Sequence, residues 1–277
     1  MSDNWIVEIL QNALATWNEK LSEVWTLLST SPEAFKGGTV WGIIENIHGG
    51  LKAIGYALLV LFFVIGVVKT CGSFAEIKRP EVAVKMFVRF VLAEAAITYG
   101  MELMLAILSI CQGVVSGIMS ASGMGGQSAV SLPAAMITAI ESVGFLDSIP
   151  LWIVALLASL LITVLSFVVV LTVYSRFFKL YFHAAIAPVA LASFAGQPSQ
   201  SIGVSFLKSY AGVCLEGAII VLACVIYSAF AMSEPVVTGA TAVNMVWSYI
   251  GELVFNLLVL VGAVRLADQT VKQMLGL

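Results

Sequence analysis

Charged side chains are scarce in this chain of 277 residues: they make up 10% of it, whereas 60% of the residues are hydrophobic and the mean hydropathy is +1.03. Soluble domains have about 25% charged and about 45–50% apolar residues. Several segments of about 20 residues carry little or no charge, which is the length that spans a hydrocarbon core about 30 Å thick. The composition therefore predicts an all-α integral membrane protein.

The residue patterns of catalysis are missing as well. His48 and His183 are far apart, and the four cysteines, Cys71, Cys111, Cys214 and Cys224, form no CxxC pair. There is no glycine-rich phosphate loop, GxSxG or HExxH motif. Buried thiols behave as small hydrophobes, with metal or redox chemistry as the alternative. We therefore expect no enzymatic activity, no cofactor, no metal and no small-molecule substrate.

The N-terminal region differs from the rest. Residues 4–29 place apolar side chains at helical spacing, and Glu8, Glu19 and Glu23 lie on other faces. Because lipid-surface helices usually have a basic polar face, we expect this amphipathic helix to dock on protein, with a lipid surface as the alternative. Breaks are predicted at glycines 37–38 and 49–50. Residues 1–49 are predicted to be an extracytoplasmic or interfacial region, and residues 50–277 a polytopic transmembrane domain.

Five spans are predicted, at residues 51–71, 86–118, 151–174, 211–232 and 243–264. Between the second and third, Ser131, Pro133 and Gly144 frame a short helix. The apolar stretch 183–194 is too short to cross and contains Pro188, so we expect a proline-broken re-entrant or interfacial helix there. Six spans is the alternative.

Orientation follows from the distribution of cations. The connection 69–89 carries five of them, Lys69, Lys78, Arg79, Lys85 and Arg89, and the loops 119–150 and 233–242 carry none. The positive-inside rule then predicts a multi-pass protein of the cell (inner) membrane, with the N-terminus outside and residues 72–84 and the C-terminus in the cytoplasm. Lys78, Arg79 and Lys85 form a cytoplasmic basic loop that either only sets topology or also contacts DNA.

Polar residues also occur at membrane depth. They are Glu94, Glu102, Glu216, Glu252 and Asn256, and Glu252 and Asn256 continue an i+4 stripe from Asn244 and Ser248. Such groups must face protein or water. They either line a conduit or form helix–helix hydrogen bonds, with carboxyls protonated or paired to Arg89 or Arg176. The small residues Ser109, Gly113, Gly117 and Ala121 allow close helix packing, and both patterns predict a homo-oligomer.

One segment carries a family resemblance. Residues 174–179 read YSRFFK, followed by LYFHAAIAPVALASF, a turn, and SFLKSYAG at residues 205–212. With Arg176, Lys179 and Pro188, this resembles the TrbL-like polytopic inner-membrane subunits of bacterial conjugative type IV secretion systems, in the short Firmicute form, over roughly residues 50–270.

The resemblance implies a non-enzymatic channel or scaffold that oligomerises and helps pass DNA or protein across the membrane. Its partners would be membrane lipid and other secretion subunits, including a conjugative ATPase, with DNA only as transient cargo. A stand-alone transporter or ion channel is the alternative function, and a phage-type pore is a third.

Overall fold

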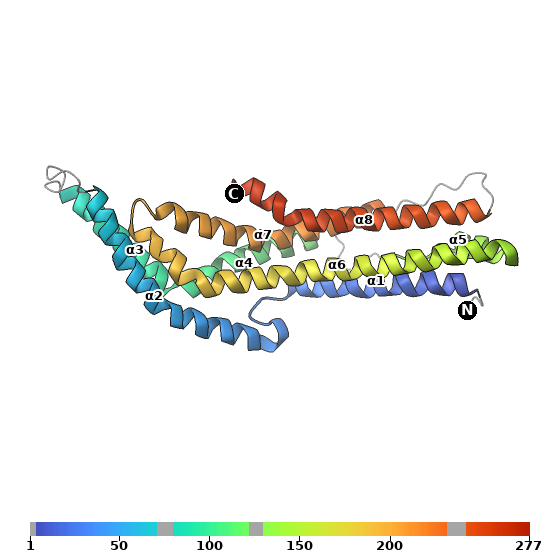
Figure 1. Cartoon of the computed structure of the whole chain (residues 1–277), viewed down its shortest axis with the longest axis horizontal. Helices are drawn as coiled ribbons and strands as arrows, with labels where there is room; N and C mark the ends of the chain where they lie inside the picture. Colours follow the sequence, from blue (N-terminus) through green and yellow to red (C-terminus); the bar gives the residue numbers. More distant parts are fainter. Residues whose placement is uncertain (1–3, 71–79, 122–129, 232–241) are drawn as a thin grey trace. The chain divides into compact units, whose positions relative to one another are not determined.

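The computed structural model describes residues 4–70, 80–121, 130–231 and 242–277, and all regular structure within these ranges is helical (Figure 1). In chain order, the α-helices and the two 3-10 turns are α1 (Trp5–Ser29), η1 (Phe35–Gly38), α2 (Thr39–Thr70), α3 (Pro80–Thr98), α4 (Gly100–Ala121), α5 (Ala134–Glu141), α6 (Phe145–Leu191), η2 (Ala192–Ala195), α7 (Gln200–Ala231) and α8 (Ala242–Leu275).

Five stretches of the described chain are long and apolar enough to cross a membrane: Phe35–Lys69, Gly100–Ala121, Ser148–Ala195, Gln200–Ser228 and Val243–Leu275. The predicted all-α membrane class is confirmed. The described helices cluster into two compact units, each assembled from separate stretches of the sequence.

The first unit comprises Met1–Ser29, Val115–Tyr174 and Ala218–Ala267. Here α1 runs parallel to the first part of α6: the Trp5 and Trp152 rings lie 5.4 Å apart, and the Lys20 ammonium lies 5.6 Å from the Phe167 ring. The apolar face of α1 is buried, and Trp17 is only 1% exposed. This confirms that the amphipathic helix docks on protein.

Polar contacts in its C-terminal half hold α1 against the rest of the first unit. The Asn18 amide donates to the Val130 carbonyl at 2.9 Å and accepts from the Val130 N–H at 3.0 Å. The Tyr174 hydroxyl donates to Glu23 at 3.4 Å, and Glu23 also accepts from Lys20 at 3.0 Å. That second bond raises the pKa of Lys20, so the ammonium is charged over the physiological range.

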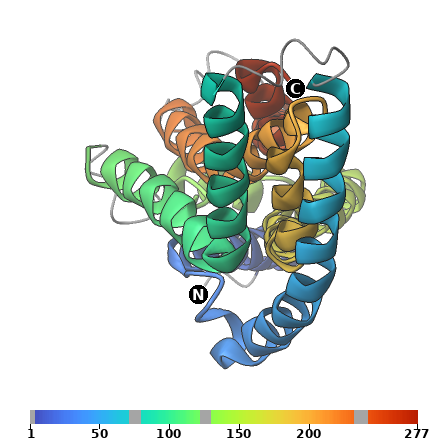
Figure 2. The same cartoon turned by 90° about the vertical axis from the view of Figure 1, so that its left-hand side faces the viewer.

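The second unit comprises Thr30–Val114, Ser175–Gly217 and Asp268–Leu277. Figure 2 shows η2, in gold, between α2 and α3. Two glycines permit this close packing. A Cβ on Gly196 would lie 2.5 Å from the Phe62 carbonyl oxygen, and a Cβ on Gly66 would lie 3.2 Å from the Gly196 Cα. Any side chain at Gly196 would push the turn away from α2.

Of the two glycine pairs predicted to interrupt helices, 37–38 does so and 49–50 does not. Gly37 and Gly38 have positive φ angles of 71° and 77°, and the chain turns there, as predicted. The break expected at residues 49–50 is wrong, because α2 continues through it. The neighbouring His48 is 2% exposed and bonds to the Ala184 carbonyl, so a tertiary contact holds this stretch helical despite a propensity cost of about 1 kcal/mol per glycine.

The apolar stretch 86–118 is not one helix. It is divided between α3 and α4 at Tyr99. Gly100 lies there against Leu191 and His48, and a Cβ on Gly100 would lie 3.2 Å from the Leu191 side chain and 3.4 Å from the His48 ring.

The short helix expected within residues 119–150 is present as α5, which begins directly after Pro133.

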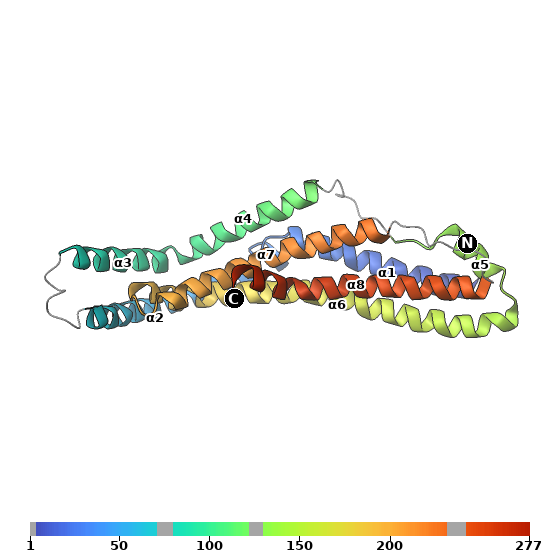
Figure 3. The same cartoon turned by 90° about the horizontal axis from the view of Figure 1, so that it is seen from above.

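The proline break expected in residues 183–194 is also wrong. α6 passes through Pro188 as one uninterrupted helix of 47 residues (Figures 1 and 3). Proline lacks the N–H that would bond the carbonyl of Ala184 one turn earlier. His48 of α2 supplies the missing donor instead, with its Nδ1 2.7 Å from that oxygen. The expected separate re-entrant helix is therefore a continuation of the third candidate span.

Gly55 brings α2 close enough for this contact. A Cβ on Gly55 would lie 2.8 Å from the Pro188 carbonyl oxygen, so only glycine allows the two backbones to meet there. The pairing of Gly55 and His48 with the proline turn fixes α2 against α6 within the second unit.

Candidate functional site

The main polar site of the second unit is a charged cluster shared by α6, α7 and α8. Glu216 of α7 is 1% exposed and accepts from the Lys179 ammonium of α6 at 3.2 Å. Lys179 also lies 3.1 Å from Asp268 of α8, and Lys272, one turn further along α8, lies 2.8 Å from the same carboxylate. Lys179 thus bridges two acids from different helices.

Arg176 lies one turn before Lys179 on α6 and is 3% exposed. Its Nε donates to the Val213 carbonyl and an η nitrogen donates to the Cys214 carbonyl, both at 3.2 Å. A Cβ on Gly217 would lie 2.6 Å from the guanidinium carbon, so this glycine provides the space that the guanidinium fills. Arg176 therefore anchors α6 to the backbone of α7.

His183 continues this line along α6. Its Nδ1 lies 2.7 Å from the Lys179 carbonyl, which can only accept, so Nδ1 carries the hydrogen. Its Nε2 lies 3.1 Å from the Ser209 hydroxyl of α7. Arg176, Lys179 and His183, spaced at i+3 and i+4, thus present one polar face of α6 to α7.

The contacts of this cluster are structural ion pairs and hydrogen bonds. Its cations are bonded to carboxylates or backbone carbonyls, and the described residues include no group of three or more His, Cys, Asp or Glu that could hold a metal ion. Breaking a buried ion pair costs about 3–5 kcal/mol because one charge is left without its partner. The arrangement suits holding three helices in register.

The remaining predicted carboxyls lie elsewhere. Glu94, Glu102 and Glu252 are exposed on α3, α4 and α8. Unlike the predicted second span 86–118, the candidate span begins at Gly100, so Glu94 precedes it and Glu102 lies in its first turn. Glu94 accepts from the Thr98 hydroxyl at 3.0 Å. The pairing with Arg89 or Arg176 that the sequence suggested does not form among the described residues, where the carboxyl buried beside Arg176 bonds Lys179 instead.

The two predicted interaction rows are also on the outside. On α8, Asn244, Ser248 and Glu252 are exposed and Asn256 is half-buried. On α4, Ser109, Gly113, Gly117 and Ala121 are all exposed. A Cβ on Gly113 or Gly117 would meet nothing within 4 Å. Among the described residues, the glycines of the α4 row therefore make no close helix contact.

The basic loop is described only in part. Lys85 is exposed on α3, and Lys78 and Arg79 lie outside the described residues.

Cys111, Cys214 and Cys224 are buried free thiols, and Cys71 is not among the described positions.

The role of His48 was missed by sequence reasoning. The signal that a donor is needed, a proline inside an apolar helix, is present in the sequence, but the identity of the donor depends on tertiary packing.

Comparison with known families adds an independent observation. The family model of the TrbL/VirB6 plasmid conjugal transfer like proteins matches residues 17–188, which is more than half of the chain. The match includes Arg176, Lys179 and Pro188 and ends before α7. No curated protein and no solved structure matches the chain. The chain belongs to the TrbL/VirB6 plasmid conjugal transfer like family.

Proposed function

We propose that this chain is an inner-membrane channel or scaffold subunit of a conjugative type IV secretion system, and that it works as a homo-oligomer without catalysing a reaction. Family membership supports a conjugative transfer role for a multi-pass membrane protein. The observation that carries the oligomeric part is that Glu102 and Glu252, which lie within candidate spans, are exposed on the surface of the single chain.

Exposed carboxyls on membrane helices need an explanation. An acidic side chain at the centre of a span costs about 2.5–3.5 kcal/mol on insertion scales, so it turns towards protein or water rather than lipid. Glu252 lies inside the candidate span Val243–Leu275, whereas Glu102 lies in the first turn of the span Gly100–Ala121, where the cost is lower. α8 adds further amide and hydroxyl groups on the same stripe as Glu252. In an oligomer, these faces would pair with neighbouring subunits or line a water-filled passage.

The buried groups have a different role in this proposal. The cluster around Lys179 and Glu216 holds α6, α7 and α8 together in each subunit, and the exposed rows assemble the subunits. The N-terminus is then outside and the basic loop inside, where it meets the conjugative ATPase and other subunits and transiently the DNA. Acids along a passage would repel phosphate, so any DNA contact falls to the basic loop.

The test is deletion of the gene in a conjugative donor, with transfer frequency as the readout. Loss of transfer that the wild-type gene restores would support the proposal. Normal transfer would overturn it and favour a stand-alone transporter or ion channel.

A variant series then tests the exposed acid. Glu252→Leu should lower transfer and the mass of the detergent-extracted oligomer, because the polar stripe loses its charged member. Glu81→Leu is the matched control, since Glu81 is an exposed carboxyl outside the candidate spans. A monomeric wild-type chain in a native-mass measurement would contradict the assembly.

A further inference from the structure

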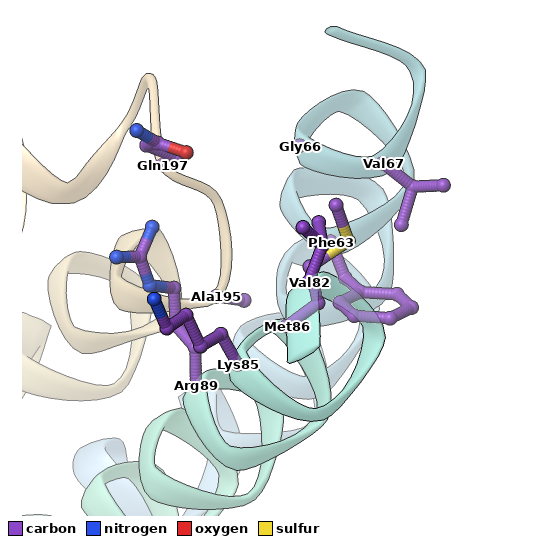
Figure 4. A pocket seen from close by; sticks show the side chains of 9 residues that line it. All are labelled: Phe63, Gly66, Val67, Val82, Lys85, Met86, Arg89, Ala195 and Gln197. Atoms are coloured by element: carbon purple, nitrogen blue, oxygen red, sulfur yellow. The ribbon is translucent and has the colours of Figure 1, made fainter. Parts of the chain in front are cut away.

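The second unit contains a cavity of about 280 Å³ between α2, α3 and the turn after η2 (Figure 4). One side of it is apolar, formed by Phe63 and Val67 of α2 and by Val82 and Met86 of α3. The other side is polar, formed by Lys85, Arg89 and Gln197. An apolar wall facing two cations is the pattern that an anionic amphiphile requires.

The two cations are available to a ligand. Figure 4 shows the charged ends of Lys85 and Arg89 side by side, on the side of the turn that carries Gln197. Lys85 is exposed and Arg89 is half-buried, and neither pairs with a carboxylate among the described residues. Two adjacent like charges repel each other, so a shared anion would stabilise this arrangement.

Close backbone contacts also fix the shape of the cavity. Its back is formed where the turn at Gly196 touches α2 at Gly66, and both glycines make contacts that a side chain would disrupt. η2 is held by the buried Ser199 hydroxyl, which donates to the Ser193 carbonyl at 2.8 Å. The turn with Gln197 is therefore fixed against α2.

The position along the chain matches the headgroup level of a bilayer. Phe63, Gly66 and Val67 lie within the last two turns of the candidate span Phe35–Lys69. With a rise of about 1.5 Å per residue, Gly66 lies only about 4.5 Å along the helix from Lys69. Polar lipid groups begin where the apolar span ends.

We propose that this cavity binds the phosphate headgroup of an anionic phospholipid, with Lys85 and Arg89 on the phosphate and an acyl chain along Phe63, Val67, Val82 and Met86. Gln197 donates its amide N–H to the same phosphate. Arg89 gives the bidentate contact for which its guanidinium is suited, and Lys85 acts as a point charge. Basic pockets between membrane helices bind cardiolipin headgroups on this principle.

The experiment uses the full chain, purified in mild detergent and titrated with cardiolipin or phosphatidylglycerol, with native mass spectrometry counting the lipids retained. The Lys85→Gln/Arg89→Gln variant should bind one of these lipids about 25-fold more weakly, because each cation near a membrane surface contributes about a fivefold factor. Lys208→Gln/Arg265→Gln is the matched control, which removes two exposed cations elsewhere and should bind as the wild type does.

A second variant separates a shaped site from diffuse attraction. Val82→Trp keeps both cations and fills the cavity, so it should lose the same lipid while its oligomer remains intact. Undiminished binding by Val82→Trp, equal losses in both charge variants, or displacement of the lipid by inorganic phosphate alone would each overturn the proposal. None of these results depends on DNA transfer, so this inference and the proposed function fail independently.

Discussion

The bond between His48 and the proline turn can be tested by a double-mutant cycle. His48→Ala removes the donor to the Ala184 carbonyl, which then has no partner because Pro188 offers no N–H. A buried carbonyl without a partner costs about 1–3 kcal/mol. Hydrogen bonds between membrane helices average about 0.6 kcal/mol and reach about 1.7 kcal/mol. We therefore expect a coupling of about 1–2 kcal/mol.

The second change in the cycle is Pro188→Ala, which restores a backbone N–H one turn after Ala184. In the Pro188→Ala background, the Ala184 carbonyl accepts a hydrogen bond from the backbone N–H of residue 188. His48→Ala then costs only the packing free energy of the imidazole ring. The packing loss is common to both backgrounds and cancels in the cycle. Unfolding of the purified chain in mixed micelles, followed by circular dichroism against detergent composition, gives the four free energies.

The control is His183→Ala in both backgrounds, because the His183 ring bonds to the Lys179 carbonyl and the Ser209 hydroxyl, whereas the Ala184 carbonyl is bonded by His48. Its coupling to Pro188→Ala should be within error of zero. If His48→Ala costs the same free energy with proline and with alanine at position 188, the imidazole does not substitute for the missing N–H and the reasoning is refuted.

Three further results are expected. Replacing Gly113 and Gly117 together with leucine should weaken the oligomer by blocking close helix approach, and an unchanged native mass would contradict this. A cysteine at Ser2 should react with an impermeant label on intact cells and one at Lys78 should not, whereas labelling of the second from outside would reverse the predicted topology. Gly217→Ala should destabilise the chain by about 1–3 kcal/mol, measured in mixed micelles, because its methyl group meets the Arg176 guanidinium.

Periodic features of this chain were predictable from the sequence, and contacts between distant segments were not. The buried face of α1 follows from helical spacing, and α5 follows from Pro133, because both signals are local. The continuity of α6 depends on His48, which lies 136 residues from Ala184 along the chain. Local rules predict a break at Pro188, and only the tertiary fold supplies the donor that prevents it.

The same distinction holds for the polar residues. The spacing of the acids predicts polar faces on their helices, but it does not say which of the acids is buried in the single chain. Glu216 is enclosed because Lys179 faces it from α6, whereas Glu94, Glu102 and Glu252 lie on outer faces. A single sequence lacks this information, since an acid facing its own chain and an acid facing a neighbour have the same periodicity.

The close contact between Arg176 and Gly217 should restrict which residues occur together at these two positions in other family members. The guanidinium occupies the volume that any larger residue at position 217 would need, and its two bonds go to backbone carbonyls rather than to a side chain. Positions 176 and 217 should therefore vary together across the family. Where arginine is retained, glycine should be retained 41 positions later, and where a smaller apolar residue replaces the arginine, alanine or serine should become acceptable at the second position.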